Sequence, residues 1–217
     1  MTPLVPILVV PTAAGLLCLL LHSRRAMALA NGLAFTVTLG LSVWLLLAMR
    51  PGPQVVTECN EFFRADALSA WMALLISVVS LGSSIYAGRY FQRDLAAGAV
   101  TPGRVKEFYV LTPLFGAGMF LVVLANNLGV MSLALEATAL SSVLLVALYN
   151  RSTSLEAAWK YVILGSLGLA LALFGTVFTY AAAIDQQSAV ELPSFNWSHL
   201  MSISGQLNPH MIKLAFV

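Results

Sequence analysis

The chain has 217 residues, of which 59% are hydrophobic and only 9% are charged, and its mean hydropathy is +0.88. Soluble domains carry about 25% charged residues, so this composition excludes a soluble fold and indicates a membrane protein. The net charge of +2 comes without a basic cluster interleaved with aromatic residues, which argues against nucleic acid as a partner. Cys18 and Cys59 form no CxxC pair, so we expect no disulfide, iron–sulfur cluster or other metal site in this chain.

Apolar stretches of about 20 residues, the length that crosses the hydrocarbon layer as a helix, follow one another along the chain. Six of them are complete: Leu4–Leu21, Ala26–Met49, Ala67–Ala87, Phe108–Ala125, Leu128–Leu148 and Ala157–Ala183. The tail HMIKLAFV opens a seventh and stops inside it, which predicts a piece of a longer protein because backbone polar groups in lipid need a finished helix. The pattern predicts an all-α polytopic membrane protein with six complete transmembrane helices and the start of a seventh.

Basic residues concentrate in alternate loops of this predicted topology. The loops after the odd-numbered spans hold seven of them: Arg24, Arg25, Arg89, Arg93, Arg104, Lys106 and Arg151. The loops after the even-numbered spans hold two, Arg50 and Arg64. Because loops rich in Lys and Arg stay in the cytoplasm, we expect the N-terminus to face the periplasm. The fourth loop is only "NN", which predicts a tight helical hairpin between the fourth and fifth spans.

Glu136 lies near the middle of the fifth predicted span, LGVMSLALEATALSSVLLVAL. A carboxylate at the bilayer centre costs about 2.5–3.5 kcal/mol on insertion scales, and intramembrane acids mark ion pathways or proton relays by default. Its helix face also holds Ser132, Ala139 and Val143, and a second stripe of small residues includes Ser142. Both stripes permit a neighbouring helix to approach closely. The alternative is a protonated acid that serves packing alone, through a hydrogen bond to a neighbouring helix.

Lys160 lies in the sixth predicted span. The preceding TSLE has the capping-box pattern, which predicts a helix start at Thr153. Lys160 then falls about seven residues, or roughly 10 Å, into the helix. Glu156 lies one turn before it, at the i, i+4 spacing that supports an ion pair. The alternative is a lysine that snorkels to the cytoplasmic interface without a functional role.

Two further ionisable residues are expected to have interfacial or helix-start roles. The sequence also lacks catalytic motifs. Lys213 stands at the outer end of the seventh span, where an interfacial lysine is common, and Asp66 precedes the third span as a helix-start or interfacial acid. The sequence contains no phosphate loop, no HExxH and no serine nucleophile elbow. We therefore expect no catalytic or cofactor-binding residues, and a buried acid and lysine without a cofactor indicate movement of protons or cations.

The central half of the chain resembles a known family of membrane subunits. The marks are NNL, LEATALSS, SLEAAWKY and FGTV in this order, and with DALSAWMALLISVVSLGSSIYAGRYF upstream they cover about residues 60–183. They resemble the antiporter-like proton-translocating subunits, which include subunits L, M and N of NADH-quinone oxidoreductase (complex I) and their relatives in multisubunit Na+/H+ antiporters. Within this family the sequence is most similar to the hydrogenase-4 branch, at its F component, in the group of membrane-bound hydrogenases and formate hydrogenlyases.

The resemblance implies roles for individual residues and for the two halves of the chain. Glu136 matches the family's essential glutamate, and Lys160 matches the lysine of the EAAxKY motif. The family's glutamate pairs with a lysine in a broken seventh helix that would follow the last residue here, so Lys213 comes too early to match it. The implied fold has about fourteen helices with inverted repeats. Residues 1–107 would be peripheral helices, and residues 108–217 the incomplete first part of the proton-channel repeat.

The function that the resemblance implies is a proton-translocating membrane subunit of a redox-driven complex in a bacterial or archaeal cytoplasmic membrane. Its partners would be the other membrane and peripheral subunits and the lipid bilayer, with no cofactor in this chain and no enzymatic activity of its own. One alternative is a cation/proton antiporter subunit without a redox partner, which would use the same residues. A second is a structural membrane anchor, in which Glu136 would tolerate apolar replacement.

Overall fold

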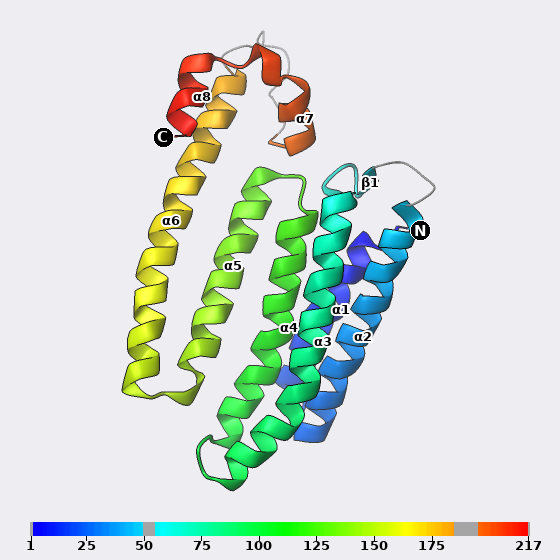
Figure 1. Cartoon of the computed structure of the whole chain (residues 1–217), viewed down its shortest axis with the longest axis vertical. Coiled ribbons are helices and arrows are strands. Elements are labelled where there is room, and N and C mark those ends of the chain that lie inside the picture. Colours follow the sequence, from blue (N-terminus) through cyan, green and yellow to red (C-terminus); the bar gives the residue numbers. More distant parts are fainter. Residues whose placement is uncertain (1, 50–54, 185–194, 217) are drawn as a thin grey trace.

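A computed structural model describes residues 2–49, 55–184 and 195–216, so Arg50 and the first part of the sixth loop, residues 185–194, lie outside the described residues. Its long helices are α1 (Leu4–Leu20), α2 (Arg24–Met49), α3 (Ala67–Ala96), α4 (Pro102–Leu124), α5 (Leu128–Val146) and α6 (Ser152–Ile184). The short elements are β1 (Val55–Glu58), β2 (Phe63–Asp66), the 3-10 turn η1 (Ala147–Tyr149), α7 (Trp197–Ser202), the 3-10 turn η2 (Ser204–Gln206) and α8 (Pro209–Ala215). Figure 1 shows the long helices running side by side.

The long apolar helices of the prediction are present, with different ends. Within the described residues, five helices, α2 to α6, are long and apolar enough to cross a membrane, whereas α1 is a shorter apolar helix of 17 residues. Helix α3 continues to Ala96 and α4 begins at Pro102, so both extend past the predicted spans into polar sequence. The apolar run marks what lipid can cover, but backbone hydrogen bonds continue a helix into the interface. At the expected seventh span, the described residues contain the short helix α8.

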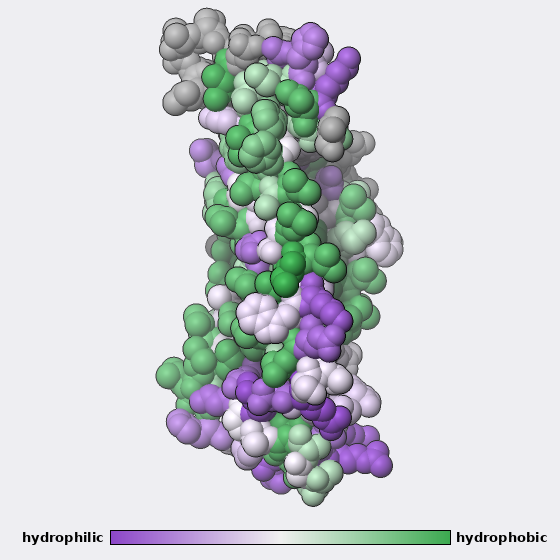
Figure 2. Space-filling model, turned by 90° about the vertical axis from the view of Figure 1, so that its left-hand side faces the viewer, coloured by the Kyte–Doolittle hydropathy of each residue, from purple (hydrophilic) through white to green (hydrophobic). Residues whose placement is uncertain are grey.

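The connections between the helices gather at two opposite ends of the molecule (Figure 1). The α1–α2, α3–α4 and α5–α6 connections lie at one end, and the β1–β2 hairpin, the α4–α5 connection, α7 and α8 lie at the other. On the face shown in Figure 2, hydrophobic residues cover the middle of the molecule and many hydrophilic residues gather at the lower end. This is the arrangement of a helical membrane protein, with apolar walls and polar ends.

The first four helices form a bundle with a cluster of buried apolar side chains toward each end. The cluster nearer the α1–α2 connection includes Cys18, Met27, Phe91 and Tyr109. The cluster nearer the β1–β2 hairpin includes Leu4, Leu45, Phe120 and Leu124. Because lipid tails are as apolar as these side chains, close packing rather than exclusion of water holds such helices together.

Small and polar residues join the helices of this bundle. A Cβ at Gly15 would lie 2.9 Å from Leu114 Cγ, so the missing side chain lets α1 approach α4 closely. Asn31 Nδ2 donates to the carbonyl oxygen of Tyr109 at 3.0 Å, and the Oγ atoms of Ser42 and Ser77 are 2.9 Å apart. In a membrane, such bonds between helices satisfy polar groups that have no water to bind.

Helix α5 packs against α4 along the predicted stripe of small residues. Ala134 is buried, and a Cβ at Gly118 of α4 would lie 2.6 Å from Thr138 Cγ2. Helix α6 in turn packs against α5 and α8, and a Cβ at Gly175 would lie 2.6 Å from the carbonyl oxygen of Ala215. The α5–α6 hairpin therefore forms an outer layer on the four-helix bundle (Figure 1).

The predicted tight hairpin between the fourth and fifth spans is confirmed, and its asparagines have distinct roles. Asn127 caps α5, because its Oδ1 accepts hydrogen bonds from the backbone N–H groups of Gly129 (3.0 Å) and Val130 (3.1 Å). Asn126 is only 2% exposed, and its Nδ2 donates to the Glu61 carbonyl at 2.8 Å and to Ser198 Oγ at 2.9 Å. One buried amide thus joins the β1–β2 turn, the α4–α5 connection and α7.

Candidate functional site

Glu136 is half-buried on the face of α5 that meets α6. It lines a small hollow of about 20 Å³ between the two helices. The other residues around this hollow are Ala139, Leu140 and Val143 of α5 and Tyr161, Val162, Gly165 and Ser166 of α6. A cavity of about this size holds roughly one water molecule. The prediction that Glu136, Ala139 and Val143 share a face toward a neighbouring helix is thereby confirmed.

The hollow combines one carboxyl group with two hydroxyl groups in apolar surroundings. Among the described residues, the Glu136 side chain has no hydrogen bond and no ion pair. A carboxyl group away from bulk water is costly to keep without a polar partner. A buried water needs about two to four polar contacts, and Tyr161 and Ser166 line the same space. The geometry can therefore hold a water molecule beside Glu136.

The two serines predicted to support Glu136 bond within their own helix. Ser132 Oγ donates to the carbonyl oxygen of Leu128 at 2.9 Å, and Ser142 Oγ donates to that of Ala139 at 2.8 Å. Neither serine lines the hollow. Their small size matters for the approach of neighbouring helices, and their hydroxyls are satisfied by the backbone.

The ion pair between Glu156 and Lys160 forms as their spacing predicts. Lys160 Nζ lies 2.5 Å from Glu156 Oε1, and the two side chains are 69% and 64% exposed on α6. Lys160 does not line the hollow, although its neighbour Tyr161 does. The structure therefore places the acid of α5 and the lysine of α6 on separate surfaces.

The predicted capping box at the start of α6 is wrong. The helix begins at Ser152, which places Thr153 inside it. Ser154 closes the first turn instead, because its Oγ accepts from the Arg151 backbone N–H at 3.0 Å and donates to the Arg151 carbonyl at 2.9 Å. Glu156 is consequently free to reach forward to Lys160. Counted from Ser152, Lys160 lies about 12 Å along the helix at 1.5 Å per residue.

The two remaining ionisable residues lie apart from the hollow. Lys213 is exposed on α8, which meets α6 at Gly175, about 15 Å along the helix from Gly165 in the hollow. Asp66 caps α3, because its Oδ1 accepts from the Ser69 backbone N–H at 2.8 Å. The expectation that Asp66 is a helix-start acid is confirmed.

Sequence reasoning missed a polar cluster at the far end of α5. The Tyr149 hydroxyl donates to Asp94 Oδ2 at 2.5 Å and lies 2.9 Å from the Tyr90 hydroxyl, while the Arg151 guanidinium stands 5.8 Å from the centre of the Tyr149 ring. These contacts join η1 to the last turns of α3. Asp94 and Tyr149 are 55 positions apart, so no local pattern could have paired them.

Comparison with known proteins finds a family model that is similar to most of the second half of the chain. Residues 125–213 match the family model described as "NADH:quinone oxidoreductase/Mrp antiporter, TM". This segment contains Glu136, the α5–α6 hollow and the Glu156–Lys160 pair.

Individual relatives agree with this match. The chain is 32% identical over 158 residues to the hydrogenase-4 component F homolog of Methylacidiphilum infernorum, covering 73% of this chain and 33% of that protein. It is 32% identical over 170 residues to NADH-quinone oxidoreductase subunit N of an Azoarcus species, covering 76% and 33%. A chain of respiratory complex I from Thermus thermophilus superposes with a TM-score of 0.69 at 25% identity, covering 99% of this chain and 41% of that one. The chain thus spans about a third of the length of the curated relatives it matches.

Proposed function

We propose that the chain is part of a proton-translocating membrane subunit of a redox-driven complex, because residues 125–213 match the family model described as "NADH:quinone oxidoreductase/Mrp antiporter, TM". The observation that carries the proposal is Glu136, an acid that lines a water-sized hollow between two apolar helices of the matched segment. Intramembrane acids are expensive and mark proton or ion pathways. The relatives bear the names of hydrogenase and NADH-quinone oxidoreductase subunits, which favours a redox-driven complex over an antiporter without a redox partner.

In this proposal Glu136 takes up and releases the proton. A water molecule in the hollow passes the proton to or from a Glu136 carboxyl oxygen, and the hydroxyls of Tyr161 and Ser166 orient that water. The Lys160 ammonium lies on the same helix, one residue before Tyr161. When Lys160 leaves Glu156, its ammonium can pair with another carboxylate, and closing the pair with Glu156 withdraws it again. The redox chemistry belongs to partner subunits, and this chain supplies neither a catalytic residue nor a cofactor.

The proposal includes a topology. Helices α1 to α6 would span the membrane and α8 would begin a seventh span, with the N-terminus in the periplasm. The segregation of Arg24, Arg89, Arg104 and Arg151 toward connections at one end supports this orientation. Helix α1, with 17 residues, is about 26 Å long, close to the roughly 30 Å hydrocarbon thickness. Residues 1–107 would be peripheral, and residues 108–217 would form the first part of a channel repeat.

The decisive test measures redox-linked proton uptake by the assembled complex in membrane vesicles. Glu136→Gln and Glu136→Ala should reduce uptake to the background level while the complex still assembles and transfers electrons. Glu107→Gln is the matched control, because Glu107 pairs with Arg104 on an exposed helix end. Wild-type uptake in both Glu136 variants would show that Glu136 serves packing only. Uptake driven by a cation gradient without electron donor would favour the antiporter instead.

A further inference from the structure

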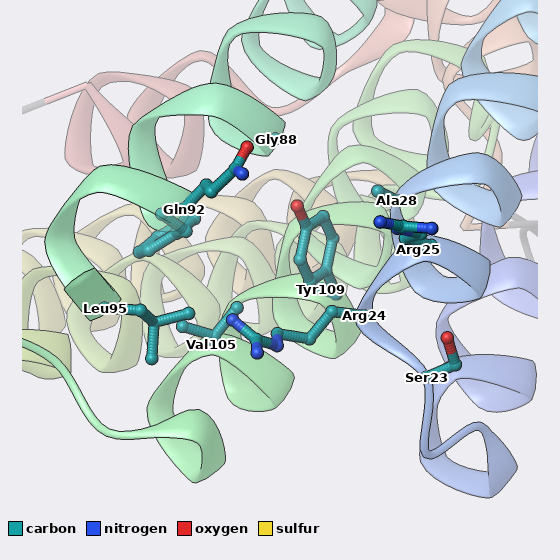
Figure 3. A pocket seen from close by; sticks show the side chains of 10 residues that line it. Ser23, Arg24, Arg25, Ala28, Gly88, Gln92, Leu95, Val105 and Tyr109 are labelled. Carbon is teal, nitrogen blue, oxygen red and sulfur yellow. The ribbon is translucent and has the colours of Figure 1, made fainter.

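A second cavity lies at the end of the bundle that carries the α1–α2 connection. It has a volume of about 590 Å³ and opens between the first turn of α2, the last turns of α3 and the first turns of α4. Its polar lining includes Arg24, Arg25, Gln92 and Tyr109 (Figure 3). None of these residues lines the hollow beside Glu136, so the cavity is a separate site.

The charge of this cavity suits an anion. Arg24 and Arg25 both line it, and within the part of the chain that the structure describes neither forms an ion pair with a carboxylate. Guanidinium groups present forked N–H donors that match the oxygen atoms of phosphate. The two guanidinium groups lie on either side of Tyr109 at one opening (Figure 3), at the polar end of an apolar bundle, and both attract an anion.

Tyr109 supplies a second, independent sign of a ligand. This residue is only 3% exposed, yet its hydroxyl forms no hydrogen bond among the described residues. Figure 3 shows the hydroxyl pointing into the cavity, between Gln92 and Arg25. The hydroxyl is open to the cavity, so an oxygen atom of a ligand bound there can accept its hydrogen bond.

An apolar groove continues from the cavity along the outside of α2 and α3. It has a volume of about 330 Å³, and it shares Ala28 and Gly88 with the arginine-lined cavity. Its floor includes Gly32, and a Cβ at Gly32 or Gly88 would meet nothing within 4 Å. The cavity and the groove together have the shape and chemistry of one amphiphile, with an anionic head and an apolar tail.

We propose that this site binds an anionic phospholipid, with its phosphate between Arg24, Arg25 and Tyr109 and an acyl chain in the α2–α3 groove. Free phosphate shares the head-group chemistry and would occupy only the arginine-lined cavity. The groove favours the lipid, because apolar walls can pack against an acyl chain but do not bind an inorganic ion. Basic pockets between transmembrane helices at the cytoplasmic side are known settings for acidic lipid head groups.

The first test quantifies phosphatidylglycerol bound to the full chain, by native mass spectrometry after release from nanodiscs of phosphatidylglycerol and phosphatidylethanolamine. The wild type should retain phosphatidylglycerol. The Arg24→Gln/Arg25→Gln variant should retain at least about tenfold less of this lipid, because two charge contacts are lost. The matched control is Arg89→Gln/Arg93→Gln, which removes the same charge from residues of α3 that do not line the cavity. Circular dichroism verifies that the variants remain helical.

The second test separates the lipid from free phosphate. Gly32→Leu should partly fill the groove and lower lipid retention, because a Cβ there meets no atom within 4 Å. Gly40→Leu should not lower it, because Gly40 is equally open on α2 but lies outside the groove. Millimolar inorganic phosphate should not displace the lipid. The proposal is overturned if the arginine variant retains as much lipid as the wild type, if both arginine pairs matter equally, or if phosphate competes while Gly32→Leu has no effect.

Discussion

The four-helix bundle and the α5–α6 hairpin bury their surfaces to very different extents. Of the apolar windows in α2, α3 and α4, 28% to 39% is buried inside the molecule, whereas the figure is 6% for the span containing α5 and 0% for α6. The bundle therefore finds more of its packing partners within the described chain than the hairpin does. The hairpin, which holds most of the family-matched segment, presents its faces to lipid or to other helices.

The polar groups of the two regions differ in the same way. In the bundle, Asn31 and the Ser42–Ser77 pair bond across helices and serve packing. In the hairpin, Glu136 faces a hollow and Lys160 pairs at the surface with Glu156. The comparison teaches that these polar groups of the bundle are hydrogen-bonded across helices, whereas in the hairpin Glu136 has no partner among the described residues and Lys160 has a partner only at the surface.

The largest loss in the free energy of unfolding is expected from a substitution at the point where the bundle and the hairpin meet. Asn126→Ala removes three hydrogen bonds of the buried Asn126 amide, to the Glu61 carbonyl, to Ser198 Oγ and from the Ser198 backbone N–H. We expect a loss of about 3 kcal/mol in the free energy of unfolding, measured by reversible unfolding in mixed micelles. The exposed change Ser83→Ala should be nearly silent. Equal losses in both variants would show that Asn126 does not join these elements.

A somewhat smaller loss should follow from forcing the hairpin away from the bundle. Gly118→Leu places a side chain against Thr138, where even a Cβ lies at 2.6 Å. Overpacking of this kind costs about 1–3 kcal/mol, and the same unfolding assay measures it. Gly168→Leu, where a Cβ meets nothing within 4 Å, is the control on α6. If the two leucines destabilise equally, the α4–α5 contact is not as close as the structure has it.

A modest effect is expected inside the bundle. Ser77→Ala deletes the hydrogen bond to Ser42, and bonds of this type between membrane helices average about 0.6 kcal/mol, with a maximum near 1.7. Unfolding of Ser77→Ala beside the exposed-serine variant Ser83→Ala measures the difference. A larger loss in the free energy of unfolding for Ser77→Ala than for Gly118→Leu would contradict the expected order of the two variants.

The smallest change in stability should come from the hairpin's surface pair. Lys160→Gln breaks an exposed ion pair with Glu156, and such pairs contribute about 0–1 kcal/mol. The same variant should nevertheless slow redox-linked proton uptake in the assembled complex. Unchanged uptake would assign Lys160 to the interface rather than to proton transfer.

The sequence predicted well what depends on local pattern. Apolar length located the long helices, and the helical period placed Glu136 and Ala139 on one face, which the α5–α6 hollow confirms. The i, i+4 rule paired Glu156 with Lys160. The predicted capping box is absent, because α6 begins at Ser152 and Ser154 forms the hydrogen bonds of the first turn with Arg151.

What the sequence could not predict depends on partners that are distant along the chain. The NN pair predicts only a short connection, whereas the amide of Asn126 bonds to Ser198, 72 positions away. The contact between Asp94 and Tyr149 likewise requires α3 and η1 to be placed in space first. The hollow beside Glu136 needs the register of α5 against α6, which no single-helix pattern determines.

Helix α5 is tied at both of its ends. Asn127 secures its first turn, and Tyr149, just beyond its last, is held to Asp94. A rod clamped at its two ends deflects most at mid-length, which is where Glu136 lies. Bending of α5 by a neighbouring helix would therefore displace the middle of the helix most. Such bending would change the distance between the Glu136 carboxyl group and α6.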